Sequence, residues 1–183
     1  MTMDQSLEAQ LRSLLAERDI RNVLLRYCRG VDRCDDSLIA SCYHDDAVDD
    51  HGNWRVSGKD APREILARVK PGPESAMHFM GNIQIEVEGD IAFAESYLLA
   101  FRTAHHNERA YTRTRAIRFV DRFSYRNGEW RISERVVVDD WNRVDEIMET
   151  MSDTPLFRPS SKDHSDPVYT IRQGRVARDP ELR

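Results

Sequence analysis

The stretch RAIRFVDRFSYRNGEWRISERVVV, residues 115–138, decides the fold class of this 183-residue chain. Its first half has apolar residues at alternating positions, which predicts an extended strand with one buried face. The pair Asn127–Gly128 follows between two alternating segments, and such a pair is the strongest short signal of a two-residue β-hairpin. The second half therefore predicts an antiparallel partner strand. The apolar positions of the two strands are Ile117, Phe119 and Phe123, then Trp130, Ile132, Val136 and Val138.

The alternation continues toward the N-terminus as far as Met77. Apolar and polar residues alternate over 83–88, and the pair Gly89–Asp90 that follows is typical of a turn. Over 91–101 large residues alternate with small ones, before a predicted loop at His105, His106 and Asn107. This half of the chain therefore predicts a meander of long antiparallel strands.

Helical spacing dominates the first third of the chain. The pattern predicts a helix from Leu7 to Val31, which Asp19 divides if it caps a second run. Short helices are predicted near 36–43 and 59–69, with a hairpin around His51–Gly52–Asn53 between them. An amphipathic helix is predicted from Trp141 onward. Helices first and strands later favour an α+β fold, with the helices packed on one side of a curved sheet.

Composition excludes several classes of protein. Lys and Arg number 27 against 32 Asp and Glu, a net charge of −5, so a nucleic-acid partner is not expected. No apolar run approaches the ~18 residues of a membrane span, and the N-terminal residues lack the pattern of a secretory signal. Three cysteines without CxxC spacing predict reduced thiols in a cytoplasmic protein.

No dinucleotide, P-loop, serine-hydrolase or zinc-protease motif is present, so acid/base side chains are the remaining candidates. Asp32 follows a predicted helix end, where the helix dipole disfavours an anion. It is either a solvent-exposed carboxylate or a general base. His78 has apolar neighbours, and it is either a partly buried structural histidine or a proton carrier that a carboxylate orients.

Two further features have a structural and a functional interpretation. Arg135 is predicted to lie opposite Ile132, Val136 and Val138, either as a surface cation or as a group that stabilises an oxyanion in a cavity. The acidic stretch from His44 to His51 lacks the spacing of a calcium loop or another metal site. We therefore expect no metal and no cofactor.

The layout resembles the SnoaL-like branch of the nuclear transport factor 2-like superfamily over about residues 7–141. The features that carry the resemblance are RYCRGVDRCD at the first helix end, SCYHDDAV, MHFMGNIQIE and RFSYRNGEWRISER. The resemblance implies a conical curved antiparallel sheet wrapped around N-terminal helices and enclosing an apolar pocket. It is strongest to cofactor-free lyases of the scytalone dehydratase, hexachlorocyclohexane dehydrochlorinase and bile-acid 7α-dehydratase types. The catalytic residues that it implies are Asp32, His78, Tyr27 and Arg135.

The expected activity is therefore elimination, by an Asp–His dyad, from a small hydrophobic cyclic or aromatic substrate. Open alternatives are an isomerase or cyclase with the same dyad, a non-catalytic small subunit of a ring-hydroxylating dioxygenase, and a ligand-binding module. We expect a homodimer or homotrimer, with a domain over 1–145 and a C-terminal extension over 146–183 as lid or subunit contact. The expected substrate-binding residues are Trp54, Met77, Met80, Tyr97, Phe101 and Phe119.

Overall fold

A computed structural model describes residues 3–69, 75–107, 109–148 and 160–171. Within them, six strands form one sheet in the order β2-β1-β6-β5-β4-β3. Neighbouring strands are antiparallel except β1 and β6, which are parallel. The strands are β1 (Tyr43–Asp50), β2 (Arg55–Ser57), β3 (Ala76–Glu88), β4 (Ile91–His106), β5 (Arg109–Arg126) and β6 (Glu129–Ile147).

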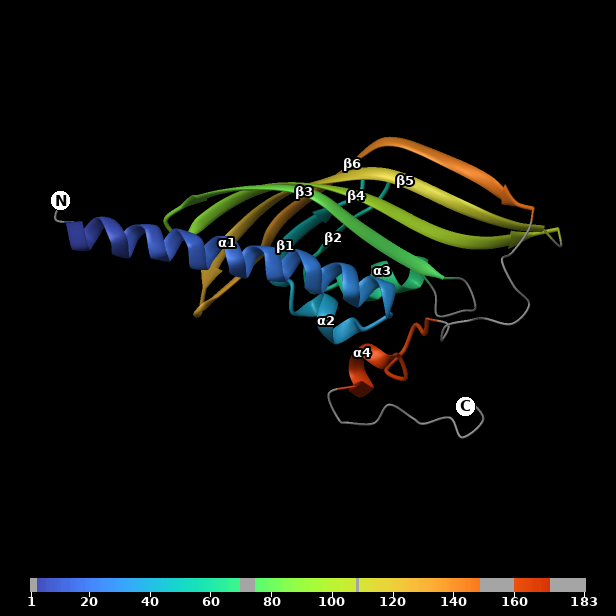
Figure 1. Cartoon of the computed structure of the whole chain (residues 1–183), viewed down its shortest axis with the longest axis horizontal. Helices are drawn as coiled ribbons and strands as arrows, with labels where there is room; N and C mark the ends of the chain where they lie inside the picture. Colours follow the sequence, from blue (N-terminus) through green and yellow to red (C-terminus); the bar gives the residue numbers. More distant parts are fainter. Residues whose placement is uncertain (1–2, 70–74, 108, 149–159, 172–183) are drawn as a thin grey trace, which may run out of the picture.

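The helices lie on one side of this curved sheet (Figure 1). They are α1 (Met3–Asp32), α2 (Asp36–Ala40), α3 (Ala61–Val69) and the short α4 (Pro167–Thr170). The α+β architecture with a curved sheet and N-terminal helices confirms the predicted fold class. No helix among the described residues is long and apolar enough to span a membrane.

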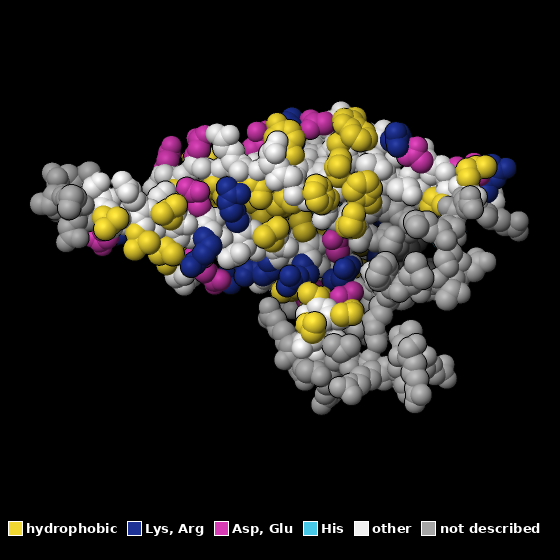
Figure 2. Space-filling model, viewed as in Figure 1, with side chains coloured by type: hydrophobic (Ala, Val, Ile, Leu, Met, Phe, Trp, Pro, Cys, Tyr) yellow, Lys and Arg dark blue, Asp and Glu magenta, His cyan; other side chains and the backbone are white. Residues whose placement is uncertain are grey.

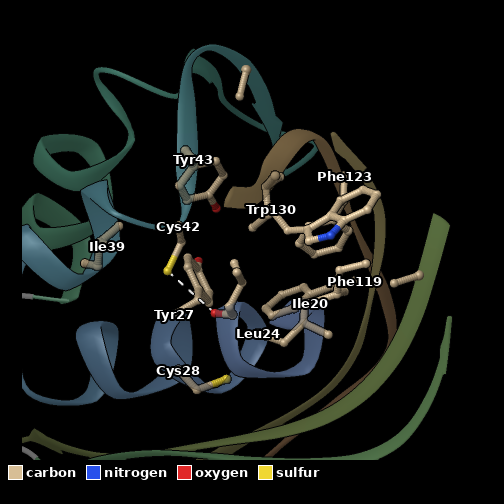
Figure 3. Close-up of a cluster of buried hydrophobic side chains, with 14 of the residues drawn as sticks. Ile20, Leu24, Tyr27, Cys28, Ile39, Cys42, Tyr43, Phe119, Phe123 and Trp130 are labelled. Atoms are coloured by element: carbon tan, nitrogen blue, oxygen red, sulfur yellow. Dashed lines mark hydrogen bonds between the residues drawn. The ribbon is translucent and has the colours of Figure 1, made fainter. Parts of the chain in front are cut away.

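Helix α1 is continuous through Asp19, so the predicted division at that residue is wrong. Its second half is buried in the core, with Ile20 and Leu24 fully covered. Figure 3 shows these side chains together with Tyr27, Tyr43 and Phe119. The first half projects beyond the sheet in Figure 1, and its leucines are largely exposed. Burial of the second half therefore fixes the position of the helix end.

The predicted hairpin at Asn127–Gly128 is confirmed. Asn127 has φ 54° and Gly128 has φ 86°, and Arg126 pairs with Glu129 across the turn. Positive φ at both central residues matches the turn types that suit the right-handed twist of paired strands. Glycine adopts this conformation without the strain that a Cβ atom would add.

The Gly128→Ala variant is expected to lower the free energy of unfolding by about 1 kcal/mol or more, because alanine is strained at positive φ. The matched control is Gly81→Ala, since a Cβ at residue 81 would meet nothing closer than the Tyr97 carbonyl oxygen at 3.6 Å. The control should change stability by less than about 0.5 kcal/mol. Urea denaturation followed by circular dichroism measures both, and equal losses would contradict the turn argument.

A β-bulge in β6 changes which side chains face the helices. Phe123 pairs with Ile132, whereas the adjacent Arg122 pairs with Glu134, so Ser133 is an extra residue in β6. The inserted residue shifts the alternation by one position. Ile132 and Arg135 are consequently both fully buried. The prediction that they lie on opposite faces is wrong, because strict alternation does not hold across the bulge.

Over the first half of β4, small residues face the core and large ones face outward. Ala92, Ala94 and Ser96 are buried, whereas Phe93 and Tyr97 are each 44% exposed. Exposed hydrophobic side chains gather over the middle of the face shown in Figure 2. The homo-oligomer stays a prediction.

The predicted helix after Trp141 is wrong over the described residues. Strand β6 continues to Ile147, and Val144 pairs with Arg113 of β5. The backbone N–H and C=O groups along the outer half of β5 need partners, and a helix at this place would leave them unpaired. Met151, which the prediction included, lies outside the described residues.

Candidate active site

Asp32 and His78 form the hydrogen-bonded pair that the sequence predicts. The His78 Nδ1 lies 2.6 Å from Asp32 Oδ1, and the His78 backbone N–H donates to Asp32 Oδ2 at 2.9 Å. Both groups are mostly buried, with side chains 16% and 12% exposed. Because the carboxylate accepts from Nδ1–H, the hydrogen bonding assigns the lone pair to Nε2. The pair therefore presents a nitrogen that can accept a proton.

Local structure explains how a carboxylate is stabilised at a helix C-terminus. Asp32 ends α1, where the helix dipole disfavours an anion, but the two N–H donors of His78 compensate for this. The chain then reverses through Cys34, which has φ 50°. Asp35 begins α2 by accepting from the Leu38 backbone N–H at 3.0 Å. This tight turn fixes Asp32 against the start of β3.

A pocket of about 300 Å³ opens beside the dyad. This volume is at the lower end for small-molecule sites and suits a ligand of one or two rings. His78 and Tyr27 line it, together with three of the predicted substrate-binding residues: Trp54, Phe101 and Phe119. His78 and three of the six predicted wall residues therefore line one cavity.

Three predicted substrate-binding residues lie away from this pocket. Met77 and Tyr97 are 52% and 44% exposed, because their strand positions face away from α1. Met80 faces inward and packs against the hydrophobic core instead. Alternation places the Met77 side chain on the opposite face of β3 from the His78 side chain.

Arg135 lies behind the pocket wall and does not line the cavity. Its Nε and Nη2 each donate to Asp121 at 2.7 Å, and both side chains are fully buried. Its guanidinium carbon lies 4.3 Å from the ring centroid of Tyr27 and 3.9 Å from that of Phe119. Burial acts against the charge of Arg135, but Asp121, together with Tyr43 and Tyr27, outweighs burial and raises the pKa of the guanidinium. A stable cation therefore supports two residues of the pocket.

Tyr27 lines the pocket and carries a neutral hydroxyl, which interacts with the Tyr43 side chain. Burial, with a smaller contribution from the Asp49 carboxylate, raises the pKa of its phenol well above the usual range. Tyr27 therefore keeps its proton at neutral pH and can donate a hydrogen bond.

The structure adds a second histidine–carboxylate pair that the sequence reasoning missed. His51 lines the same pocket, and its Nε2 lies 3.2 Å from Asp49 Oδ2. Asp49 is fully buried, and its Oδ1 has no hydrogen-bond partner among the described residues. His51 stacks on Trp54 with ring centroids 3.9 Å apart. Asp49 and His51 are two positions apart in the sequence, a spacing that places side chains on one face of an extended chain. This spacing was the available signal for the pair.

The two histidines reach one cavity from distant parts of the sheet. His78 lies on β3, at one edge, whereas His51 follows β1, next to the other edge. Both histidines nevertheless line the same pocket of this curved sheet.

Within the described residues, no group of three or more histidine, cysteine or acidic side chains is placed to bind a metal ion. The acidic stretch instead forms separate contacts. His44 Nε2 lies 3.0 Å from the Ser124 carbonyl oxygen, and Asp46 pairs with Arg126 at 2.8 Å.

Comparison with known proteins identifies the fold. A family model described as a SnoaL-like domain matches residues 12–136. None of the curated proteins compared with the chain matches it. Many solved structures match, and three of them are informative.

A scytalone dehydratase candidate from Novosphingobium aromaticivorans is 18% identical, with a TM-score of 0.63 over 81% of this chain and 97% of that one. A type 2 hexachlorocyclohexane dehydrochlorinase is 19% identical, with a TM-score of 0.62 over 81% of this chain and 97% of that one. A nuclear transport factor 2-like protein with a cystatin-like fold, also from N. aromaticivorans, is 25% identical, with a TM-score of 0.59 over 74% and 90%. At 18% and 19% identity, the first two structures show a shared fold and nothing further.

Proposed function

Because the chain belongs to the SnoaL-like domain family, we propose that it is a cofactor-independent lyase acting on a small hydrophobic cyclic or aromatic substrate. The observation that carries the proposal is the Asp32–His78 pair, which lies at 2.6 Å beside an apolar pocket. Family members serve several functions on this fold, so the argument for catalysis depends on the site and not on the fold.

In the proposed reaction, Asp32 holds the Nδ1–H of His78, and Nε2 accepts a proton from a substrate carbon. The electrons of that C–H bond form the new double bond, and the bond to the leaving group breaks. Tyr27 stabilises negative charge on a substrate oxygen by donating its hydroxyl proton in a hydrogen bond. Arg135 is a positioning residue, which acts through Tyr27 and Phe119 by holding a positive charge behind them.

His51 supplies the second proton in this scheme. When His51 is protonated, its Nε2–H donates a hydrogen bond to Asp49, and its Nδ1–H can be donated to the substrate. A departing hydroxyl group takes that proton and leaves as water, so one histidine gains a proton and the other loses one. The buried Asp49 carboxylate balances the charge of the imidazolium.

The test of the activity is a screen of alicyclic and aromatic alcohols and halides, followed by mass spectrometry of the products. Loss of water or hydrogen halide supports the lyase proposal. A product of unchanged mass and altered retention identifies an isomerase with the same dyad. Failure to convert any member of the panel contradicts catalysis by this pocket.

The His51→Gln variant is expected to lower kcat about 10²-fold for an alcohol substrate. A halide substrate should lose much less, because a halide leaves without a proton. His105→Gln is the control, since His105 is exposed and does not line the pocket. Steady-state kinetics with both substrate types checks this, and equal losses for alcohol and halide would contradict the role of His51 as proton donor.

A further inference from the structure

The charge of the pocket is opposite to that of the whole chain. Among the described residues that line it, four are arginines and none is Asp or Glu, although the chain has a net charge of −5. The arginines are Arg68 of α3, Arg102 of β4, and Arg113 and Arg115 of β5. A cleft lined by one sign of charge concentrates ligands of the opposite sign.

Strand pairing arranges three of these arginines in two rows beside the dyad. One row runs from His78 on β3 through Ala100 on β4 to Arg115 on β5. Adjacent strands lie ~4.8 Å apart, so the backbones of His78 and Arg115 are about 10 Å apart with only a small side chain between them. That span accommodates the body of a one- or two-ring ligand.

The neighbouring row is Ala76, Arg102 and Arg113, in the same strand order. Arg102 and Arg113 are direct cross-strand partners, and like charges in such pairs destabilise a sheet. An anion beside Arg113 would add an opposite charge at this pair of like charges.

The row along β5 also changes from polar to apolar with depth. Arg113 and Arg115 are exposed, whereas Ile117 and Phe119 further along the same face are buried. All four line the pocket. The cavity therefore has an apolar interior and a cationic mouth.

The four arginines differ in how far other groups already engage them. Arg68 pairs with Glu64 at 2.9 Å, and Arg102 donates to the carbonyl oxygens of Arg68 and Val69 at the end of α3. Arg115 pairs with Asp139 at 3.1 Å, but this pair is exposed and therefore weak.

Arg113 forms no ion pair or hydrogen bond with a side chain in the described parts of the chain. It is therefore the cation most open to a ligand at the mouth of the pocket.

We propose that the pocket binds an organic anion, whose hydrophobic ring lies between Trp54 and Phe119 and whose carboxylate or phosphate is held by Arg113 with help from Arg115. The proposal rests on the proposed function in that it names the substrate class of the same site. Binding alone tests it, so it can fail or succeed independently of turnover.

The experiment measures binding to the full chain by calorimetry and by quenching of tryptophan fluorescence, to which Trp54 in the pocket contributes. The anions are benzoate, 2-naphthoate, phenyl phosphate and 2-naphthyl phosphate, and the neutral counterparts are benzamide and 2-naphthamide. We expect at least one anion to bind about tenfold more tightly than its neutral counterpart. The preference should decrease with added NaCl. Carboxylates and phosphates of the same ring size distinguish the two possible anionic groups.

The Arg113→Gln variant should lose about tenfold in affinity for the preferred anion and little for the amides. Arg113→Lys keeps the charge and should recover part of the loss. Arg126→Gln is the matched control, because Arg126 lies at the far end of β5 and outside the pocket. Equal affinity of every anion and its neutral counterpart, or equal affinities of Arg113→Gln and Arg126→Gln for the anion, would overturn the proposal.

A further variant separates this proposal from the lyase proposal. His78→Ala removes the base and should keep the preference for anions. Anion binding that depends on Arg113, in a protein that converts no substrate, would support this proposal and contradict the lyase. Turnover of neutral substrates without any preference for anions would support the lyase and contradict the anion-binding proposal.

Discussion

Replacing Asp32 with asparagine is expected to lower kcat/KM about 10²–10⁴-fold while leaving the fold intact. The reason is the number of acceptors at this position. Asp32 accepts from two donors of His78, the backbone N–H and the ring Nδ1–H. Asparagine has one acceptor oxygen and an amide group that only donates.

The backbone N–H of His78 cannot change its role, so the asparagine oxygen should pair with it. The amide then faces Nδ1, which has to accept, and the ring proton moves to Nε2. This is the wrong tautomer for a base that faces the pocket. The nitrogen chemical shifts of the His78 ring report the tautomer directly and do not require knowledge of the substrate.

Asp36→Asn is the matched control, because Asp36 is an exposed carboxylate in the first turn of α2, outside the dyad. It should leave both the kinetics and the His78 tautomer unchanged. His78→Ala alone, and combined with Asp32→Asn, should cost about as much as Asp32→Asn alone, since residues that act as a unit are not additive. An Asp32→Asn variant with near-normal activity and an unchanged tautomer would refute the dyad.

Replacing Asp121 with alanine is expected to lower the free energy of unfolding by about 3–5 kcal/mol. Asp121 is the ion-pair partner of Arg135, and both side chains are fully buried. Its removal leaves a guanidinium in the core whose remaining hydrogen bond within the described residues is to the Tyr43 hydroxyl at 3.4 Å. An unpaired buried charge has lost its hydration without compensation.

The control is Asp46→Ala, which breaks an exposed ion pair with Arg126 and should cost less than about 1 kcal/mol. If Asp121→Ala does not fold, the double variant Asp121→Leu with Arg135→Met should, because it removes both charges together. Guanidinium denaturation measures all three proteins. A loss for Asp121→Ala no larger than for Asp46→Ala would show that the buried pair is not required for stability.

The dyad was accessible from sequence because each partner stands at an element boundary that local patterns predict. Asp32 ends a helix, and His78 is the third residue of a strand. The resemblance to known lyases then paired them. The long-range contact itself has no local signal, since 46 positions separate the two residues.

Other parts of the site depend on which face of a strand points toward the core, and alternation alone does not determine this. In β4 both alternating sets contain apolar residues, so the pattern did not reveal that Ala94 and Ser96 face the core while Tyr97 faces outward. Packing against the helices decides this, because small side chains on the inner face leave room for α1. Arg135 was misplaced for a related reason, because nothing in the local sequence marks Ser133 as an inserted residue.

The predicted C-terminal helix failed because its apolar spacing also fits a strand. Val144 and Ile147 suit either element when read alone. The length of β5 settles the matter, since its outer half needs a hydrogen-bonding partner and β6 supplies one. This requirement arises from strand pairing in the tertiary structure, and a local pattern of about a dozen residues does not contain it.

The extra residue at Ser133 makes one codon dispensable for the pairing of these two strands. An in-frame deletion of that codon would leave Ile132 and Arg135 two positions apart, so strict alternation alone would point both side chains toward the helices. Phe123 would still pair with Ile132, and Asp121 would still pair with Arg135, so the buried cation would keep its counterion. A second inserted codon at the same place would instead require a larger bulge or an exchange of the faces of β6. The gene can therefore lose three nucleotides at this position, but not gain three, without changing the electrostatic background of the pocket.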